Sequence, residues 1–322
     1  MMGSDDTDFG MKGRSQAVSN SSPMGRAEMD SSRDSPVPVH EKNNLDLRHQ
    51  LTIWERHPKA GTTPVELESA AEEQDFILFC LPAIPHFDLA SRLRPQLHRE
   101  CLCLNFAKGL DQRGRTAAQA MSAALGRNPA FGVLYGPMIS EEIRAGRPAF
   151  AQAGIANAER YGRIRALYAG TPLYLEHSAD ITSISWAAAL KNVYAMLFGV
   201  ADELNLGDNM RGYFAASVLE ELEQIIASLC GSPEAVRRLA GLGDLITTAT
   251  SAGSHHHDLG RRLVRGQDEV IEGEGVHTLK MIRDHGLFDS RRYPLFDLIG
   301  SLLAEPTAAG SQMKKYLEQL LR

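Results

Sequence analysis

Two charged residues stand in segments of the sequence that carry almost no other charge. Lys191 is the one formally charged residue between Ile181 and Val200, in the run ITSISWAAALKNVYAMLFGV. Burying an ammonium group among such apolar neighbours is costly unless the group is paired or gives up its proton. A lysine held in this way can exchange a proton with a substrate. The alternative is that Lys191 reaches water from the edge of a core helix, and its position alone leaves both interpretations open.

The second charged residue is Asp244, in the run GLGDLITTAT from Gly241 to Thr250. An acidic residue followed by hydroxyl-bearing and small residues is typical of the wall of a polar cleft rather than of a core. Asp244 could therefore hydrogen-bond the ammonium group of Lys191 and set its pKa. The alternative is that Asp244 caps the helix that follows it.

Three consecutive histidines follow shortly after, at His255, His256 and His257. Consecutive side chains rarely point at one metal ion, and neither a cysteine nor a suitably spaced carboxylate completes a set of ligands. We therefore expect no zinc site in this segment.

The elements that would position these residues alternate between strand and helix in the first half of the chain. Short apolar runs predict strands that are buried on both faces, and two segments between them have helical spacing. The alternation predicts an α/β domain, residues 46–182, with a doubly wound parallel sheet covered by helices on both sides. The predicted strands are 51–54, 76–81, 102–106 and 131–134, and the predicted helices are 87–97 and 116–125.

From about residue 183 the strand patterns give way to long helical ones. One apolar helical face runs from Phe214 to Leu229, Gly231 can end that helix, and Ser232 with Pro233 can begin another. We expect residues 183–322 to form an all-helical domain. Ligands of open parallel sheets bind beyond the carboxyl ends of the strands, so the cleft between the two domains is the expected active site.

Composition argues against several classes of protein. The 322 residues are 43% hydrophobic with a net charge of −6, which is ordinary for a globular protein and offers no footprint for nucleic acid. The run 181–200 is near membrane length, but its polar residues indicate a buried protein helix, and the amino terminus lacks the apolar core of a secretory signal, so we expect no membrane insertion. Four cysteines without a disulfide pattern favour a reducing cytoplasm. Residues 1–45, rich in Ser, Asp, Gly and Pro, predict a disordered tail.

Six short motifs occur in the order and spacing of one enzyme family. From Leu51 to the carboxy terminus the chain resembles the NAD(P)-dependent glycerol-3-phosphate dehydrogenases, two-domain enzymes that interconvert glycerol 3-phosphate and dihydroxyacetone phosphate. The resemblance implies NAD or NADP as cofactor, a small phosphorylated substrate, a cytoplasmic homodimer, a Rossmann-like first domain, a helical substrate and dimerisation domain, and a role in supplying glycerophospholipid precursors. The motifs are AKGL at 107–110, GP at 136–137, ALKNV at 189–193, GDN at 207–209, GLGDL at 241–245 and EGV at 274–276.

The resemblance also implies a role for each matching residue. Lys191 matches the catalytic lysine, which exchanges the proton of the substrate C2 hydroxyl, and Asp244 matches the aspartate that orients it. Lys108 matches a lysine that polarises the substrate near the nicotinamide. The other implied substrate-binding positions are Gly136, Asn192, Thr248, Ser254, His255 and His256, and the implied cofactor-binding positions are Arg56, Lys108, Ser140, His255 and Glu274.

The sequence departs from the family pattern in two main places. Relatives have Ser-Arg-Asn-Arg where this chain has Ser254 and three histidines. An imidazole is mostly neutral above a pKa of about 6.5, whereas arginine is permanently charged, so phosphate affinity should fall. Relatives open with a strand and G-x-G-x-x-G, which cradles the pyrophosphate, and no such sequence precedes Leu51. We therefore expect an incomplete Rossmann-like sheet, in which 51–54 pairs directly with 76–81 or remains a fragment.

Two alternative functions stay open. The chain could be a catalytically degenerate homologue that serves as a regulatory or dimerisation module, because the glycine-rich loop is missing. It could also be a related dehydrogenase for another hydroxy substrate, because the arginine that grips the substrate phosphate is replaced.

Overall fold

The computed structural model describes residues 49–57, 65–126, 130–251, 253–266 and 272–321. All of them belong to one of the two units into which the chain divides, Lys42–Arg322. The predicted disordered tail, residues 1–45, lies outside the described residues, so that prediction stays open.

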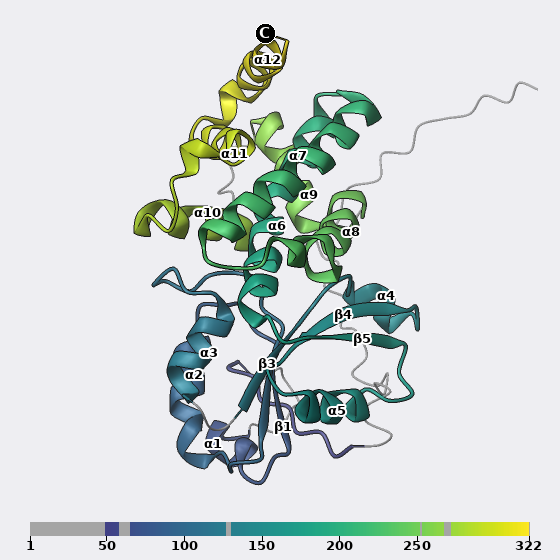
Figure 1. The fold of residues 1–322 in the computed structure, drawn as a ribbon, viewed down its shortest axis with the longest axis vertical. Coiled ribbons are helices and arrows are strands. Elements are labelled where there is room, and N and C mark those ends of the chain that lie inside the picture. The colour runs from purple at the N-terminus through teal and green to yellow at the C-terminus, as the bar shows by residue number, and fades with distance from the viewer. Residues whose placement is uncertain (1–48, 58–64, 127–129, 252, 267–271, 322) are drawn as a thin grey trace, which may run out of the picture. The chain divides into compact units, whose positions relative to one another are not determined.

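Five strands form one sheet in the order β1-β2-β3-β4-β5 (Figure 1). β1, β2 and β3 are parallel, with Phe76 opposite Leu102 and Leu102 opposite Ala130. Their apolar runs are continuous because parallel strands are usually covered on both faces. β4 runs antiparallel to β3, and β5 runs parallel to β4. The strands are β1 (Phe76–Phe79), β2 (Leu102–Asn105), β3 (Ala130–Tyr135), β4 (Ala149–Gly154) and β5 (Leu173–Ser178).

The sheet differs from the sequence prediction in two respects. The strand patterns miss β4 and β5, and the pairing of β3 with β4 is not parallel. Of the two outcomes expected for 51–54, pairing with 76–81 is wrong and the unpaired fragment is confirmed, because these residues join no strand in the described sheet. Leu51 and Ile53 are 45% and 66% exposed, and only Trp54 packs on the core beside β1. An apolar fragment without a paired neighbour does not make a stable strand.

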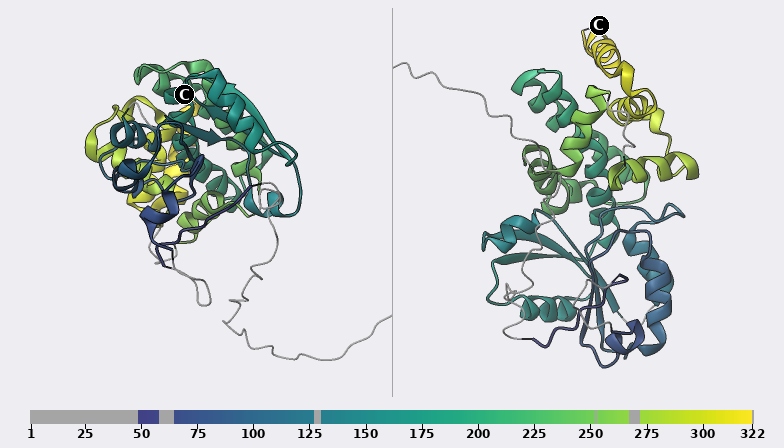
Figure 2. Two further views of the ribbon diagram at one scale, coloured as in Figure 1. Left: turned by 90° about the horizontal axis from the view of Figure 1, so that it is seen from below. Right: turned by 180° about the vertical axis from the view of Figure 1, so that it is seen from behind.

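Helices cover both faces of the sheet (Figures 1 and 2). On one face, α1, α2 and α3 form a core with Phe79 and Cys103. On the other face, α5 forms a core with Leu104 and Leu134. The prediction of a doubly wound, Rossmann-like sheet is confirmed. The helices are α1 (Leu67–Ala71), α2 (His86–Leu93), α3 (Ala117–Leu125), α4 (Ser140–Arg144) and α5 (Ala158–Leu167).

The rest of the described chain is helical and is built around α6 (Figure 1). α6 begins where the side chain of Asp180 accepts the backbone N–H of Ser183, a normal amino-terminal cap. The prediction of an all-helical second half is confirmed, although Pro233 begins a 3-10 turn, Pro233–Arg237, rather than an α-helix. The helices are α6 (Ile181–Glu203), α7 (Gly207–Ser228), α8 (Asp244–Thr250), α9 (His255–Arg265), α10 (Glu274–His285), α11 (Pro294–Ala304) and α12 (Ala309–Leu320).

Among the described helices, α6 alone is long and apolar enough to cross a membrane. Its apolar window is buried entirely within the fold, where α7, α8, α9 and α10 pack against it. The apolar composition of α6 is therefore accounted for by its place at the centre of the helical core.

Candidate active site

Lys191 lies in the middle of α6 and is almost completely enclosed, with 4% of its surface exposed. Its ammonium group is 3.0 Å from the carboxylate of Asp244 and donates a hydrogen bond of 2.6 Å to the hydroxyl of Thr248. Asp244 and Thr248 are four residues apart in α8, so both side chains face the same way. The two charged residues that stand out in the sequence are therefore in contact, and Lys191 does not reach bulk water.

A second lysine reaches the same carboxylate from the sheet. Lys108 follows β2, and its ammonium group lies 2.7 Å from the carboxylate of Asp244 and donates to the backbone carbonyl of Gly136 at 3.1 Å. Asn192, beside Lys191 on α6, donates a hydrogen bond of 3.1 Å to the backbone carbonyl of Lys108. Asp244 thus binds two ammonium groups, at the carboxyl ends of β2 and β3, where open sheets bind ligands.

Gly136 allows a close approach of the chain between β3 and β4. Its φ is 155°, and a Cβ at this position would lie 2.4 Å from the backbone oxygen of Phe150. Any other residue would collide with the neighbouring backbone, so the position requires glycine. This approach holds the carbonyl of Gly136 beside Lys108.

A pocket of about 160 Å³ lies beside the charged groups. One wall comes from the segments that follow β2 and β3, and the other comes from α6, α8 and the segment between α8 and α9. This is the place expected from the carboxyl ends of the strands. The sequence interpretation does not name Ile139, Thr247, Ser251 and Gly253 as site residues. The hydroxyl-rich run after Asp244 could have indicated Thr247 and Ser251. The lining consists of Lys108, Met138, Ile139, Lys191, Asp244, Thr247, Thr248, Ser251, Gly253 and Ser254.

The contacts set the protonation of this site. Burial lowers the pKa of Lys191 to about 8, an effect that Asp244 opposes and Lys108 reinforces. Burial alone would raise the pKa of Asp244, but the charges of Lys108 and Lys191 outweigh burial and hold this pKa below its usual value. At neutral pH the site therefore holds one carboxylate between two ammonium groups. A small rise in pH, to about 8, is enough for Lys191 to begin losing its proton.

Glu274 is a half-buried carboxyl group near the two lysines. It begins α10, where a Cβ on the next residue, Gly275, would lie 2.6 Å from the backbone oxygen of Asn192. Burial raises the pKa of Glu274, while Lys108 and Lys191 act in the opposite direction. The start of α10 is therefore packed directly on α6 beside the charged site.

His256 is the histidine of the tract that lies nearest to the lysines. Burial, together with the charges of Lys191 and His255, lowers its pKa to about 3, so the imidazole is neutral. Its Nδ1 is buried and has no hydrogen-bond partner among the described residues. An unpaired buried nitrogen next to the pocket is available to a ligand.

Of the seven predicted site residues that do not line the pocket, three are exposed. Arg56 is exposed and makes no hydrogen bond or ion pair within the described part of the chain. Ser140 is the exposed first residue of α4 and hydrogen-bonds its neighbour Glu141. His255 is exposed, with its Nε2 3.3 Å from the backbone carbonyl of Glu272. The structure does not bring these three side chains to Lys191.

The described strands do not provide the cradle that a dinucleotide pyrophosphate requires, which is a glycine-rich loop between a strand and a helix amino terminus. β1 is followed by CLPAIP, from Cys80 to Pro85, which contains two prolines and no glycine. β2 is followed by FAKG and β3 by Gly136 and Pro137, with one glycine each. The charged pocket therefore fits a small anion, and none of the segments that follow β1, β2 and β3 is a glycine-rich pyrophosphate loop.

Comparison with known proteins identifies the family. Residues 48–160 match the NAD-dependent glycerol-3-phosphate dehydrogenase N-terminus, and residues 180–313 match the C-terminus of the same family. A glycerol-3-phosphate dehydrogenase (NAD(P)+) of Agrobacterium fabrum is 27% identical over 298 residues, which cover 85% of this chain and 91% of the relative. The enzyme of the same name from Gloeobacter violaceus is 30% identical over 264 residues, which cover 79% and 85%.

Solved structures agree on the fold. A glycerol-3-phosphate dehydrogenase from Coxiella burnetii superposes with a TM-score of 0.69 at 22% identity, covering 79% of this chain and 80% of that one. A glycerol-3-phosphate dehydrogenase from Plasmodium falciparum superposes with a TM-score of 0.68 at 15% identity, covering 77% and 74%. At these identities the structures establish the architecture, and the sequence matches establish the relationship. The chain belongs to the NAD-dependent glycerol-3-phosphate dehydrogenase family.

Proposed function

We propose that this chain is an NAD(P)-dependent dehydrogenase that interconverts glycerol 3-phosphate and dihydroxyacetone phosphate. The observation that carries the proposal is the buried Lys191, paired with Asp244 beside a pocket whose other cation is Lys108. A desolvated lysine with a pKa of about 8 is suited to exchanging a proton near neutral pH. Membership of the family supports the same reaction.

In this proposal Lys191 exchanges the proton of the substrate C2 oxygen. In the reducing direction its ammonium group donates a proton as the carbonyl becomes a hydroxyl, and in the oxidising direction the neutral amine accepts that proton. Lys108 adds a second positive charge that stabilises negative charge developing on the oxygen. Asp244 orients both ammonium groups. These residues handle the proton, and the NAD(P) dinucleotide used by the family would supply or accept the hydride.

The pocket suits a small phosphorylated substrate. Its volume of about 160 Å³ admits only a small molecule. Thr248 and Ser254 supply hydroxyl groups, and the amino terminus of α9, which begins next to Ser254, contributes partial positive charge for an anion. Asn192, His255 and His256 complete the proposed substrate contacts, with Gly136 contributing its backbone.

We extend the proposal to the organisation of the whole chain. Residues 46–182 act as the cofactor domain, and residues 183–322 act as the substrate domain and join two copies into a homodimer in the cytoplasm. The four cysteines are unpaired, which fits a reducing compartment. Light scattering on the purified chain measures the dimer directly, and a monomer at all concentrations would contradict it.

Dinucleotide binding and turnover by the purified full-length chain test the proposed reaction. NADH or NADPH should bind in a fluorescence titration, and reduction of dihydroxyacetone phosphate should disappear in Lys191→Ala. Failure to bind either dinucleotide would instead favour a degenerate homologue, which the missing pyrophosphate cradle supports. Turnover of an unphosphorylated hydroxy substrate in place of the phosphorylated one would favour the related dehydrogenase.

A further inference from the structure

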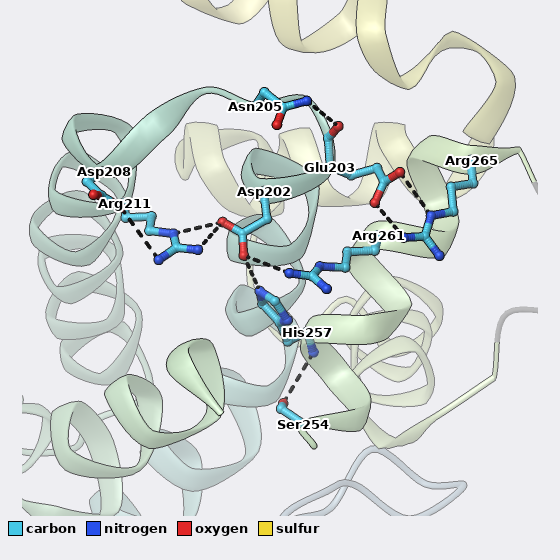
Figure 3. Close-up of polar contacts among 9 residues, drawn as sticks. All are labelled: Asp202, Glu203, Asn205, Asp208, Arg211, Ser254, His257, Arg261 and Arg265. Carbon is cyan, nitrogen blue, oxygen red and sulfur yellow. Dashed lines mark hydrogen bonds and ion pairs between the residues drawn. The ribbon is translucent and has the colours of Figure 1, made fainter. Parts of the chain in front are cut away.

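The carboxyl end of α6 carries a charged network that the proposed reaction does not use (Figure 3). Asp202 is the next-to-last residue of α6, and its side chain is 10% exposed. It accepts hydrogen bonds from Arg211 at 2.7 Å, His257 at 2.8 Å and Arg261 at 3.3 Å. Burial alone would raise the pKa of Asp202, but the donors Arg211 and His257 outweigh burial and keep the carboxylate ionised. The network therefore ties α6 to both α7 and α9.

Backbone contacts fix the first turn of α9 at the same place. A Cβ on Gly199 would lie 1.9 Å from the backbone oxygen of His257, and a Cβ on Gly260 would lie 2.0 Å from that of Met196. The two helices therefore cross with their backbones in contact, which only glycine permits. The backbone N–H of His257 also donates to the capping hydroxyl of Ser254 at 3.3 Å. His257 is thus held through its backbone and, by Asp202, through its imidazole.

The same turn of α9 also borders the substrate pocket. Ser254 lines the pocket together with Lys191. His256 lies close enough to Lys191 for the lysine charge to lower its pKa. Successive side chains of a helix point about 100° apart, so His256 can face the lysine while His257 faces Asp202. The turn of α9 that His257 links to Asp202 therefore begins beside the wall of the pocket.

We propose that Asp202 is a positioning residue: through His257 it holds the first turn of α9 so that Ser254 and His256 shape the substrate pocket. This role rests on the proposed function, because it assigns the held turn to the binding of glycerol 3-phosphate. Asp202 touches neither the substrate nor Lys191, and it acts only through α9.

The neighbouring residue provides a matched control. Glu203 forms an ion pair with Arg265, the last residue of α9, at 2.8 Å. Both carboxylates therefore stand at the same end of α6 and both bind α9. Arg265 lies eight residues beyond His257, about 12 Å further along the helix. The Glu203 pair consequently holds the far end of α9 and leaves the pocket wall alone.

Asp202→Asn and Glu203→Gln, compared in the full-length chain, test the role. Calorimetric titration with glycerol 3-phosphate should show a dissociation constant about tenfold higher in Asp202→Asn, because a misplaced binding group loses affinity steeply with small shifts. Glu203→Gln should stay within about twofold of the wild type, and the kcat of both variants should be unchanged since Lys191 and Asp244 are untouched. Amide hydrogen exchange at residues 255–257 should quicken only in Asp202→Asn.

The outcomes separate this role from the proposed function. An unchanged dissociation constant in Asp202→Asn, or an equal rise in both variants, would overturn the positioning role. A wild-type chain that does not bind glycerol 3-phosphate would refute the proposed function, and amide exchange would then decide the role of Asp202, with equal exchange in the two variants counting against it. Should Asp202→Asn fail to fold, His257→Ala makes the same comparison, because it removes the link from Asp202 to the first turn of α9 and leaves Asp202 paired with Arg211 and, further along α9, with Arg261.

Discussion

Replacing Lys191 by methionine should abolish turnover and, near neutral pH, stabilise the fold. Methionine suits the apolar centre of α6, where Leu190 and Val193 are fully buried, and it cannot exchange a proton. The wild-type lysine is buried in its charged form, which burial disfavours. The substitution therefore separates the contribution of Lys191 to chemistry from its effect on stability.

The size of the stability effect follows from the pKa of Lys191. The ordinary value of 10.5 falls to about 8 in the fold. At about 1.4 kcal/mol per unit, the charged form is disfavoured by about 3 kcal/mol relative to the unfolded chain. Because the folded pKa is below the unfolded one, this destabilisation is complete below about pH 8 and disappears as the pH rises through the unfolded value. The free energy of unfolding of the wild type should therefore increase by about this amount as the pH rises from about 8 to the unfolded pKa, and that of the methionine variant should not.

Urea denaturation near pH 7 and near pH 10 measures the difference. The advantage of Lys191→Met in free energy of unfolding should be larger near pH 7 than near pH 10 by about 2 to 3 kcal/mol. In the methionine variant Asp244 still lies beside Lys108, and the loss of its other partner is common to both measurements. Lys280→Met replaces a lysine whose side chain is 64% exposed and should show no such trend. An advantage that does not change with pH, or retained turnover, would refute the reasoning.

Three other predictions concern the same site. The rate of carbonyl reduction should fall as the pH rises through about 8, where Lys191 loses its proton, while the rate of alcohol oxidation should rise. Initial rates in both directions measure this, and parallel pH profiles would contradict the role of Lys191 as the proton-exchanging group. His255→Arg should tighten the binding of glycerol 3-phosphate several-fold above neutral pH, where an imidazole is ordinarily neutral, and should make the affinity less dependent on pH. Calorimetric titration at two pH values measures both effects. An unaltered affinity would count against His255 as a phosphate contact. Gly136→Ala should destabilise the fold by several kcal/mol because its Cβ would overlap the backbone oxygen of Phe150, and wild-type stability in urea would show that the turn can relax.

The contact between Lys191 and Asp244 could be anticipated because each residue is out of place in its own segment. A charge in an apolar run, and an acid before a run of hydroxyl groups, each needs a partner, and each segment supplies what the other lacks. Arg56, Ser140 and His255 offer no such local signal. Their predicted roles come from the resemblance alone, and the structure places none of them in the pocket wall.

The strands show where local patterns stop being sufficient. The continuous apolar runs of β1, β2 and β3 indicate parallel strands directly, and of these β2 and β3 are buried while β1 is mostly half-buried. β4 and β5 escape detection because β4 is rich in small residues and β5 alternates between exposed and half-buried positions. The opposite error occurs at Leu51 to Trp54, whose apolar residues have no neighbouring strand to pair with. Strand formation depends on a partner elsewhere in the chain. Composition therefore overestimates the tendency of residues 51–54 to form a strand and underestimates that of β4 and β5.

The histidine tract shows how a helix can give one short motif several surroundings. His255 is exposed beside the carbonyl of Glu272, His256 is half-buried near Lys191, and His257 binds the carboxylate of Asp202. Because successive side chains point about 100° apart, three neighbours on one turn reach three different environments. Because α6 and α9 cross closely, His257 can bind Asp202, which is 55 residues away in the sequence, from the turn of α9 that begins beside the pocket wall. That crossing needs glycines on two helices separated by about sixty residues of sequence, so it becomes visible only when the helices are placed side by side.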